Sequence, residues 1–369
     1  MELRQLLDMQ IVQRWLFIIW AAFAGPVILT LIPLKLFDPL RRFYYAICRR
    51  GKLLRTSDSA RRGLQAGVLH NFGVILRLTV PQSFFVHFYI AGLLLNTILL
   101  FTAFGFACKC SGGVRDQFSS VVAQLTGAGV EHIPFAGDSV PVLGKYGREA
   151  WRLVFLLLLF QIHLVRRLYE CIFVSKFNPA ARMNLLGYII AIGFYVNAPL
   201  ILFSQAFGEE GISKAFTAYL TQKLKQGGDE WMESTQKAPD ILDLVSYLGR
   251  IGWWPYLGAA ISLFGAYHQF ICHDILAGLR EDESPGSSEK YHLPTGDWFE
   301  LVSCPHYFAE IIIYIGFLVA SGGTSPLMYL LLGLVVANLY LVAKPTHEWY
   351  LAKFDDYPKS RRAMIPYIC

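Results

Sequence analysis

Apolar residues gather in seven runs separated by polar segments: 15–36, 84–108, 151–174, 183–207, 241–265, 307–320 and 326–343. A membrane-spanning helix needs roughly 20 mostly apolar residues, and the first five runs meet that length. The last two are shorter, and the intervening "SGGTSP" predicts a tight helical hairpin. The pattern therefore predicts an all-α integral membrane protein with seven transmembrane helices, folded as a single polytopic domain over residues 1–369.

Positive charge in the loops predicts the orientation. Residues 35–81 carry ten Lys or Arg against two acids, the strongest basic block in the chain. Because basic loops stay on the cytosolic side, this block is expected there. Alternation then places the N-terminus in the lumen and the C-terminus in the cytosol. The first run, which contains Gly25, Pro26 and Pro33, has no clear cleavage site and is read as a retained anchor.

Composition agrees with this topology. The chain is 54% hydrophobic and 16% charged, and its mean hydropathy is +0.42. The net charge of +6 follows from the loop bias, and no module for nucleic-acid binding accompanies it. Seven scattered cysteines and nine histidines show no spacing typical of a disulfide framework or a metal site, so no metal is expected.

Polar side chains are costly inside a membrane and tend to mark function. Here they gather at the predicted cytosolic ends of the spans, in "QSFFVHFYI" (82–90), "FQIHLVRRLYE" (160–170), "GAYHQFICHDILAGLR" (265–280) and 291–369. In the segment 160–170, Arg166 and Glu170 stand one helical turn apart, as do His163 and Arg167. This spacing fits either a functional site or a structural salt bridge at the end of a helix, and both interpretations stay open. In the segment 265–280, Arg280 could bind a phosphate group, but an arginine at the end of a span could equally lie at the membrane interface without a ligand.

The segment "YHLPTGDWFELVSCPHYFAEIIIYIG" and the tail "FDDYPKSRRAMIPYIC" resemble the steroid 5α-reductase family. Within it, "GAYHQFICHDILAGLR", "VPQSFFVHFYIAG" and "IHLVRRLYECIFVSKF" are similar to the polyprenol reductase branch. The resemblance is strongest over 265–369. It implies a multi-pass reductase of the endoplasmic reticulum membrane that uses NADPH, with the cofactor in a cytosol-facing cavity roofed by the loop after the fifth span and by the tail.

The resemblance also implies the residues that hold the cofactor. Gln269, His273 and Arg280 stand where the family binds phosphates and ribose, whereas His306 and Glu310 stand near the nicotinamide. His306 replaces an Asn of most steroid-reducing members, and Tyr350 matches a cofactor-contacting tyrosine with His347 beside it. The full set expected to bind the cofactor is Gln269, His273, Arg280, Tyr291, His292, His306, Tyr307, Glu310 and Tyr350.

Two departures from the family fall on the substrate side. A Gln-Glu pair of the steroid reductases is replaced by His87 and Phe88, followed by Tyr89, and Leu164 stands in place of a tyrosine. These changes imply the same hydride chemistry on a long-chain polyprenoid for dolichol synthesis and protein N-glycosylation. Because an isolated allylic alcohol accepts hydride poorly, the enal polyprenal is the expected substrate, and a partner dehydrogenase would interconvert alcohol and aldehyde.

The reaction needs a donor to the developing enolate oxygen and a source for the proton. His87, Tyr89 and His347 are the predicted catalytic residues. Three other functions stay open: a steroid (brassinosteroid-type) 5α-reductase, an enoyl-thioester reductase, and a lipid transporter or sensor. A transporter would place ionisable groups near the middle of the membrane, whereas here they gather at the cytosolic ends.

Overall fold

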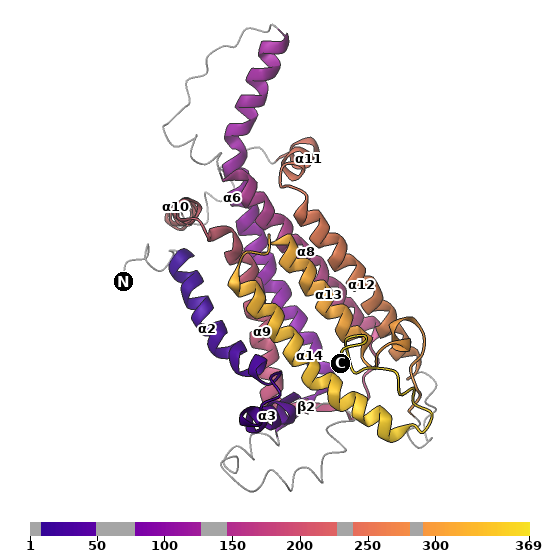
Figure 1. The fold of residues 1–369 in the computed structure, drawn as a ribbon. Helices are drawn as coiled ribbons and strands as arrows, with labels where there is room; N and C mark the ends of the chain where they lie inside the picture. The colour runs from indigo at the N-terminus through magenta and orange to yellow at the C-terminus, as the bar shows by residue number, and fades with distance from the viewer. Residues whose placement is uncertain (1–8, 49–77, 127–145, 227–238, 281–290) are drawn as a thin grey trace.

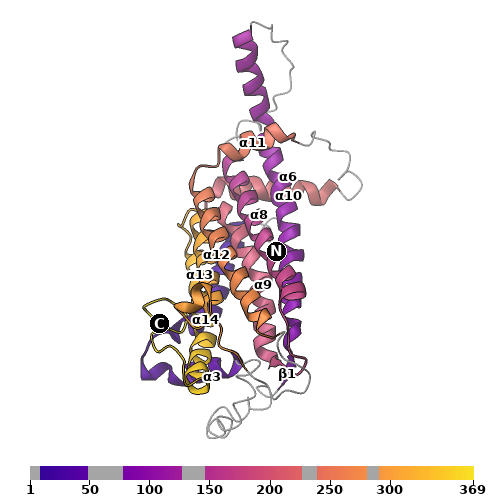
Figure 2. The ribbon, with the colours of Figure 1, turned by 90° about the vertical axis from the view of Figure 1, so that its right-hand side faces the viewer.

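The computed structural model describes residues 9–48, 78–126, 146–226, 239–280 and 291–369. Long helices run side by side along one axis, with short helices and loops at the two ends (Figures 1 and 2). The long helices are α2 (Met9–Leu29), α6 (Phe85–Thr126), α8 (Gly147–Tyr169), α9 (Leu185–Ser204), α12 (Trp254–Gly278), α13 (Pro305–Ala320) and α14 (Pro326–Lys353). The chain is therefore mostly helical, as the sequence predicts.

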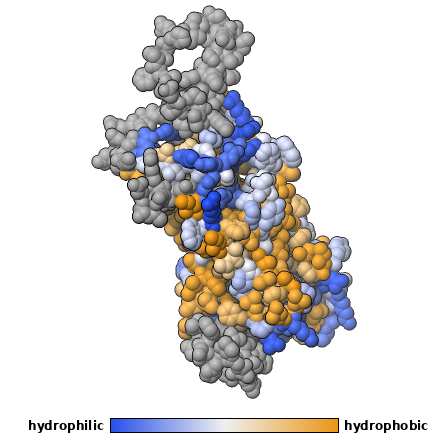
Figure 3. All heavy atoms as spheres, turned by 60° about the vertical axis from the view of Figure 1, so that its left-hand side comes forward, coloured by the Kyte–Doolittle hydropathy of each residue, from blue (hydrophilic) through white to orange (hydrophobic). Residues whose placement is uncertain are grey.

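Several of these helices are apolar enough to cross a membrane. Four meet the length and composition of a span, namely Met9–Leu29, Gln82–Ser111, Leu185–Phe207 and Pro326–Lys353. Large apolar side chains such as Ile18 and Phe101 lie exposed on the outer faces of α2 and α6, and Figure 3 shows an apolar surface over the middle of one side of the molecule. A multi-pass membrane protein follows, while the count of seven spans and the orientation stay predictions.

The predicted fifth span differs from the helices found. Residues 241–265 do not form one helix: α11 (Ile241–Gly249) ends before a turn, and α12 then begins at Trp254. Gly252 has a φ of +93° in that turn, and Pro255 stands in the first turn of α12. A left-handed glycine followed by a helix-starting proline ends one helix and begins the next, so the long helix in this region begins at Trp254 and not at residue 241.

Short elements close one end of the bundle. Strand β1 (Thr79–Pro81) pairs antiparallel with β2 (Arg182–Asn184), in the register Thr79 to Asn184. Helix α3 (Asp38–Cys48) lies across this end (Figure 1). Its Arg41 donates to the carbonyls of Thr30 at 3.0 Å and Ile32, just beyond α2. Helix α10 (Glu210–Gln226) and α11 lie toward the opposite end. Within the basic block 35–81, residues 38–48 thus form a helix. Residues 49–77 of the block lie outside the described residues.

Helices α12 and α13 approach through small residues. A Cβ on Gly258 would lie 2.3 Å from the Ala320 nitrogen, and one on Gly316 would lie 2.6 Å from the Gly258 oxygen. Ser262 donates to the carbonyl of Ile313 at 3.0 Å across the same contact. Small residues of this kind let membrane helices pack backbone to backbone. The contact fixes the positions along α12 and α13 from which the polar side chains described below project.

The C-terminal residues fold back on the loop before α13. Backbone nitrogens of Ser303 and Cys304 donate to the carbonyls of Arg362 at 2.8 Å and Ala363 at 3.1 Å. Arg361, which is buried, donates to the carbonyl of Pro294 at 3.0 Å and pairs with Glu300. A hydrogen bond from the Gly296 N–H lowers the pKa of the Glu300 carboxyl. The tail therefore packs on this loop, whereas the predicted roof over a cofactor cavity stays a prediction.

Candidate active site

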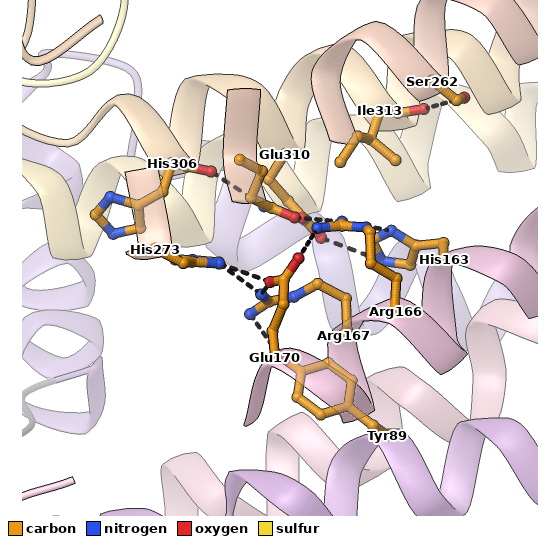
Figure 4. A network of polar contacts seen from close by, with 11 residues as sticks. Tyr89, His163, Arg166, Arg167, Glu170, Ser262, His273, His306, Glu310 and Ile313 are labelled. Atoms are coloured by element: carbon orange, nitrogen blue, oxygen red, sulfur yellow. Dashed lines mark hydrogen bonds and ion pairs between the residues drawn. The ribbon is translucent and has the colours of Figure 1, made fainter. Parts of the chain in front are cut away.

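A cluster of charged side chains forms where α8 ends beside α12 and α13 (Figure 4). Helix α8 finishes in one π-helical turn, Glu170–Val174, and this turn directs Glu170 into the interior. The Glu170 side chain is fully buried and pairs with both Arg166 and Arg167. Two guanidinium groups around one carboxylate satisfy its oxygens and leave positive charge for other partners.

Helix α12 adds a histidine to this carboxylate. His273 Nδ1 lies 2.7 Å from Glu170 Oε2 and 2.8 Å from Arg167 Nη1. A protonated Nδ1 donates to the carboxylate, whereas an unprotonated Nδ1 accepts from the guanidinium, so each tautomer satisfies one of the two contacts. The position of one proton on His273 therefore changes how Arg167 is held.

Gln269, one helical turn before His273, links all three helices. Its Oε1 accepts from Arg166 Nη2 at 2.5 Å, and its Nε2 donates to Glu310 Oε2 at 2.5 Å and to the His306 carbonyl at 3.1 Å. The arginine can only donate and the carboxylate only accept, so these neighbours fix the orientation of the amide. The second oxygen of Glu310 lies 3.7 Å from His163 Nε2 of α8.

Tyr89 on α6 completes the cluster. Arg167 Nη2 donates to the Tyr89 hydroxyl oxygen at 2.8 Å, and the guanidinium lies 5.2 Å from the ring centre. The Tyr89 side chain also hydrogen-bonds to that of Tyr195. Since the phenol oxygen accepts from a cation, its own O–H can donate to one further acceptor, either Tyr195 or a ligand in the cavity. Tyr89 is 5% exposed, so that acceptor has to come from within the protein interior.

A cavity of about 230 Å³ opens beside Tyr89 and joins two unlike regions. The first, called here the polar end, is formed by Tyr89, Arg167, Gln269, His273, His306, Tyr307, Glu310 and Tyr314. The second, called the apolar arm, extends between α2, α3, α9 and α14 and includes Phe23, Val27, Ile47, Ile190, Phe194, Leu334 and Leu339. A ligand with a polar head and a hydrocarbon tail matches this division.

Half of the predicted site residues reach this cavity. Among them is Tyr89, from the predicted catalytic set, and its Arg167 contact was not foreseen. The other members that line the cavity are Gln269, His273, His306, Tyr307 and Glu310. The His306 and Tyr307 rings lie 4.1 Å apart, and His306 lies 5.5 Å from His273.

His87 and Arg280 lie elsewhere among the described residues. His87 Nδ1 is 3.0 Å from the Tyr188 hydroxyl, and its ring lies 4.6 Å from that of Phe84; it is not part of the cavity lining. Arg280, just beyond α12, donates to the carbonyl of Lys176. Neither residue contacts the Glu170 cluster through the hydrogen bonds described.

His347 and Tyr350 are on the final turns of α14, which runs through Pro345 to Lys353, and not in an extended tail. His347 Nδ1 lies 2.6 Å from the Ser303 hydroxyl, which also bonds Tyr357. Burial raises the pKa of Tyr357, so its phenol stays protonated. The Tyr350 and Tyr357 rings stack at 5.6 Å.

The segment before α13 holds the two remaining members of the predicted cofactor set. Tyr291 packs edge-on against Trp349 at 4.9 Å, while His292 is exposed. With His347 and Tyr350 on α14, they mark a second group of predicted residues, next to the tail and apart from the Glu170 cluster.

Several residues of the site were not in the predicted catalytic or cofactor set, namely Arg166, Arg167 and Glu170 at the end of α8 and Tyr195 and Tyr314 in the cavity lining. From the sequence, Glu170 could be either a site residue or the partner in a structural salt bridge. The feature that pointed to it was a single acid at the basic end of a helix. Tyr195 and Tyr314 line the cavity, but a tyrosine within an apolar run gives no sign of the face on which it lies.

The polar end can accept part of a nicotinamide cofactor. A carboxamide needs one acceptor and one donor. Glu310 offers carboxylate oxygens, and the ring nitrogens of His273 and His306 donate or accept according to their tautomers. These groups are gathered on one wall of the cavity, so the residues present fit the nicotinamide end.

Comparison with known proteins extends these observations. Residues 250–369 match the family model described as 3-oxo-5-alpha-steroid 4-dehydrogenase. The chain is 36% identical over 354 residues to Polyprenal reductase 2 of Arabidopsis thaliana, covering 95% of each chain. It is 36% identical over 368 residues to Polyprenal reductase 1 of Oryza sativa subsp. indica, covering 97% of this chain and 98% of that one. Polyprenal reductase of Xenopus tropicalis is 32% identical over 290 residues, covering 78% and 80%.

Proposed function

Because this chain belongs to the polyprenal reductases of the steroid 5α-reductase family, we propose that it saturates the α-isoprene double bond of polyprenal with NADPH. The observation that carries the proposal is Tyr89, which Arg167 holds in the lining of a cavity that has both a polar end and an apolar arm. An aldehyde at Tyr89 leaves its isoprenoid tail in the apolar arm. Burial of a hydrocarbon there contributes roughly 25 cal/mol per Å² removed from water.

The chemistry requires a donor at the carbonyl oxygen. When bound, NADPH supplies the hydride that adds to the β carbon of the enal. Negative charge then develops on the aldehyde oxygen, and the Tyr89 O–H donates a hydrogen bond to that oxygen. A proton from water is added at the α carbon, which completes the saturated aldehyde. As the Tyr89 O–H donates, the phenol oxygen becomes more negative. The Arg167 guanidinium stabilises this charge, because it already donates a hydrogen bond to the phenol oxygen. Glu170 and His273 position Arg167 and do not touch the substrate in this scheme.

The cofactor residues have separate tasks in this proposal. Glu310 and His306 orient the carboxamide of the nicotinamide, and Gln269 holds Glu310 in place through its 2.5 Å bond. His347, Tyr350, Tyr291 and His292 lie near the tail, where the adenine and ribose portions would extend. Arg280, at the protein surface, is the cation proposed for phosphate.

The cellular setting follows from the proposed substrate. A polyprenal dissolved in a bilayer reaches the cavity from the membrane, and the endoplasmic reticulum is the proposed location. Reduction of the enal yields dolichal, a saturated aldehyde. A separate alcohol dehydrogenase must therefore supply polyprenal from polyprenol and reduce dolichal to dolichol.

A direct assay tests the function. Purified protein with NADPH is given polyprenal or polyprenol separately, and the product is read by mass for a gain of two hydrogens. We expect polyprenal alone to be reduced efficiently. Efficient reduction of polyprenol with no aldehyde formed would refute the enal as the substrate.

Two variants test the residues in the same assay. Y89F removes the hydroxyl and keeps the ring, and we expect a loss of about 10²-fold in turnover, as for one oxyanion donor. H87A tests the prediction for His87, whose bond to Tyr188 points to a smaller effect. Near-normal turnover of both variants would remove these residues from the mechanism.

A further inference from the structure

Tyr314 on α13 carries a buried hydroxyl that no other described residue satisfies. The residue is 1% exposed, and among the described residues its hydroxyl has no hydrogen-bond partner. Buried hydroxyls in folded proteins are nearly always hydrogen-bonded. Tyr314 also lines the cavity, so a ligand in the cavity can supply the missing acceptor.

The helix places Tyr314 on the reactive side of the cavity. It follows His306 and Glu310 at intervals of four residues, so the three side chains share one face of α13. Its ring makes edge contacts with Phe317 at 5.4 Å and His163 at 6.1 Å and a tilted contact with Phe194 at 6.2 Å. A ring held on several sides keeps its hydroxyl in a constant direction.

A second tyrosine connects this position with Tyr89. Tyr195 on α9 lies 5.1 Å from the Tyr89 ring and 5.4 Å from Phe194, which in turn contacts Tyr314. Tyr89 and Tyr314 thus approach the cavity from α6 and α13, two helices distant in the sequence. An aldehyde oxygen has lone pairs for two such donors.

We propose that Tyr314 donates a second hydrogen bond to the carbonyl oxygen of the enal, opposite Tyr89. This rests on the proposed function of the same cavity. Tyr314 is then a catalytic residue, since two phenol donors share the charge that develops on the oxygen. Donors preorganised in a water-poor site stabilise such charge far better than donors in water do.

An optical measurement tests the bond without turnover. Farnesal, a conjugated enal of three isoprene units, is bound to the purified full-length protein in detergent without NADPH. Hydrogen bonding to the carbonyl moves its ultraviolet band to longer wavelength. We expect the band bound to Y314F to lie at shorter wavelength than the band bound to wild type. An unchanged band overturns the proposal.

The matched control is Y219F. Tyr219 on α10 is another buried tyrosine, packed against Phe216 of the same helix and Phe106 of α6, and it is not in the cavity lining. Phenylalanine keeps the ring packing in both variants, so folding is preserved. We expect Y219F to reproduce the wild-type band; a Y219F shift equal to that of Y314F would remove the specificity of the effect and refute the assignment.

Turnover gives a second, independent reading. With polyprenal and NADPH, we expect Y314F to lose about 10²-fold in kcat, as for one oxyanion donor, with the affinity for NADPH unchanged. The double variant Y89F/Y314F should lose less than the product of the single losses, because both hydroxyls serve one oxygen. A strictly multiplicative loss would place them on different atoms. If wild type does not reduce polyprenal, the proposed function fails, while the optical shift still decides the bond.

Discussion

At the polar end of the cavity the charged side chains are each fixed by several polar partners, whereas the apolar arm is formed mainly by hydrocarbon side chains. Glu170 contacts Arg166, Arg167 and His273, and the helices that carry Gln269 and Glu310 touch backbone to backbone. The apolar arm is lined by Val27, Ile190, Leu334 and similar residues from four helices.

The difference reflects what each region has to recognise. Hydride transfer requires a head group held within a fraction of an ångström, and that needs side chains whose own positions are determined. An isoprenoid tail is a repeating hydrocarbon, so it needs area and shape but no single polar contact. We therefore expect substitutions at the polar end to lower turnover by about 10²-fold or more, and substitutions in the apolar arm to change which chain length is accepted.

The largest effect is expected from E170Q. Glutamine has the same shape but no charge, and Arg166 and Arg167 would then be buried without their shared carboxylate. Removing one member of a buried ion pair costs about 3–5 kcal/mol. We expect that loss in the free energy of unfolding, measured by chemical denaturation in detergent, together with loss of turnover as Arg167 leaves Tyr89.

The control for E170Q is E210Q. Glu210 also pairs with a cation, Lys214 at 2.5 Å, but both side chains are exposed, at 67% and 75%. Exposed pairs contribute about 0–1 kcal/mol. Equal stability of the two variants would contradict the view that Glu170 organises the polar end.

A smaller loss is expected where α12 meets α13. G258A places a Cβ 2.3 Å from the Ala320 nitrogen and 2.4 Å from the Gly316 oxygen. Backbone atoms cannot rotate away as a side chain can, so the two helices must separate. Overpacking of this kind lowers the free energy of unfolding by about 1–3 kcal/mol. Separation also lengthens the Gln269–Glu310 bond, and we expect kcat to fall with it, measured as turnover of polyprenal alongside the thermal midpoint.

G193A is the matched control on α9. A Cβ there meets nothing within 4 Å, and alanine in a helix is favoured over glycine by about 1 kcal/mol. G193A should therefore be neutral or more stable. A G258A protein that behaves like G193A would show that the close contact does not determine the site.

Much of this architecture was readable from the sequence because it follows from hydropathy. The apolar runs predicted long helices, four of which are long and apolar enough to cross a membrane, and "SGGTSP" correctly predicted the turn between α13 and α14. The division of the 241–265 run was missed, since its apolar residues continue through Gly252 and hide the left-handed turn. Hydropathy averages over a window and does not register one backbone angle.

The site was readable only in part, and for a physical reason. Spacing along one helix places Gln269 beside His273, and His306 beside Glu310, on a common face. Contacts between helices depend instead on rotation and depth, so the Arg167–Tyr89 bond could not be derived. The Tyr314 hydroxyl is the extreme case, because its significance lies in a missing partner that no sequence pattern records.

The smallest effect is expected in the apolar arm, from G187A. A Cβ on Gly187 would lie 2.7 Å from the carbonyl oxygen of Ile47 on α3, and both residues line the cavity. Helix α3 would have to move away from α9, which alters the arm and leaves the polar end in place. We expect KM to change for long polyprenals and to stay near the wild-type value for farnesal, with kcat unchanged for both.

Steady-state kinetics with a series of prenals of increasing length measures this, with G193A on the same helix as the control. The reasoning is that farnesal places few isoprene units in the arm, so a displaced α3 affects it little, whereas each added unit makes the substrate more sensitive to the shape beside Ile47. A fall in kcat for farnesal would mean that α3 also supports the polar end. The contrast between a fixed head-group site and a tolerant tail site would then be wrong at this point of contact.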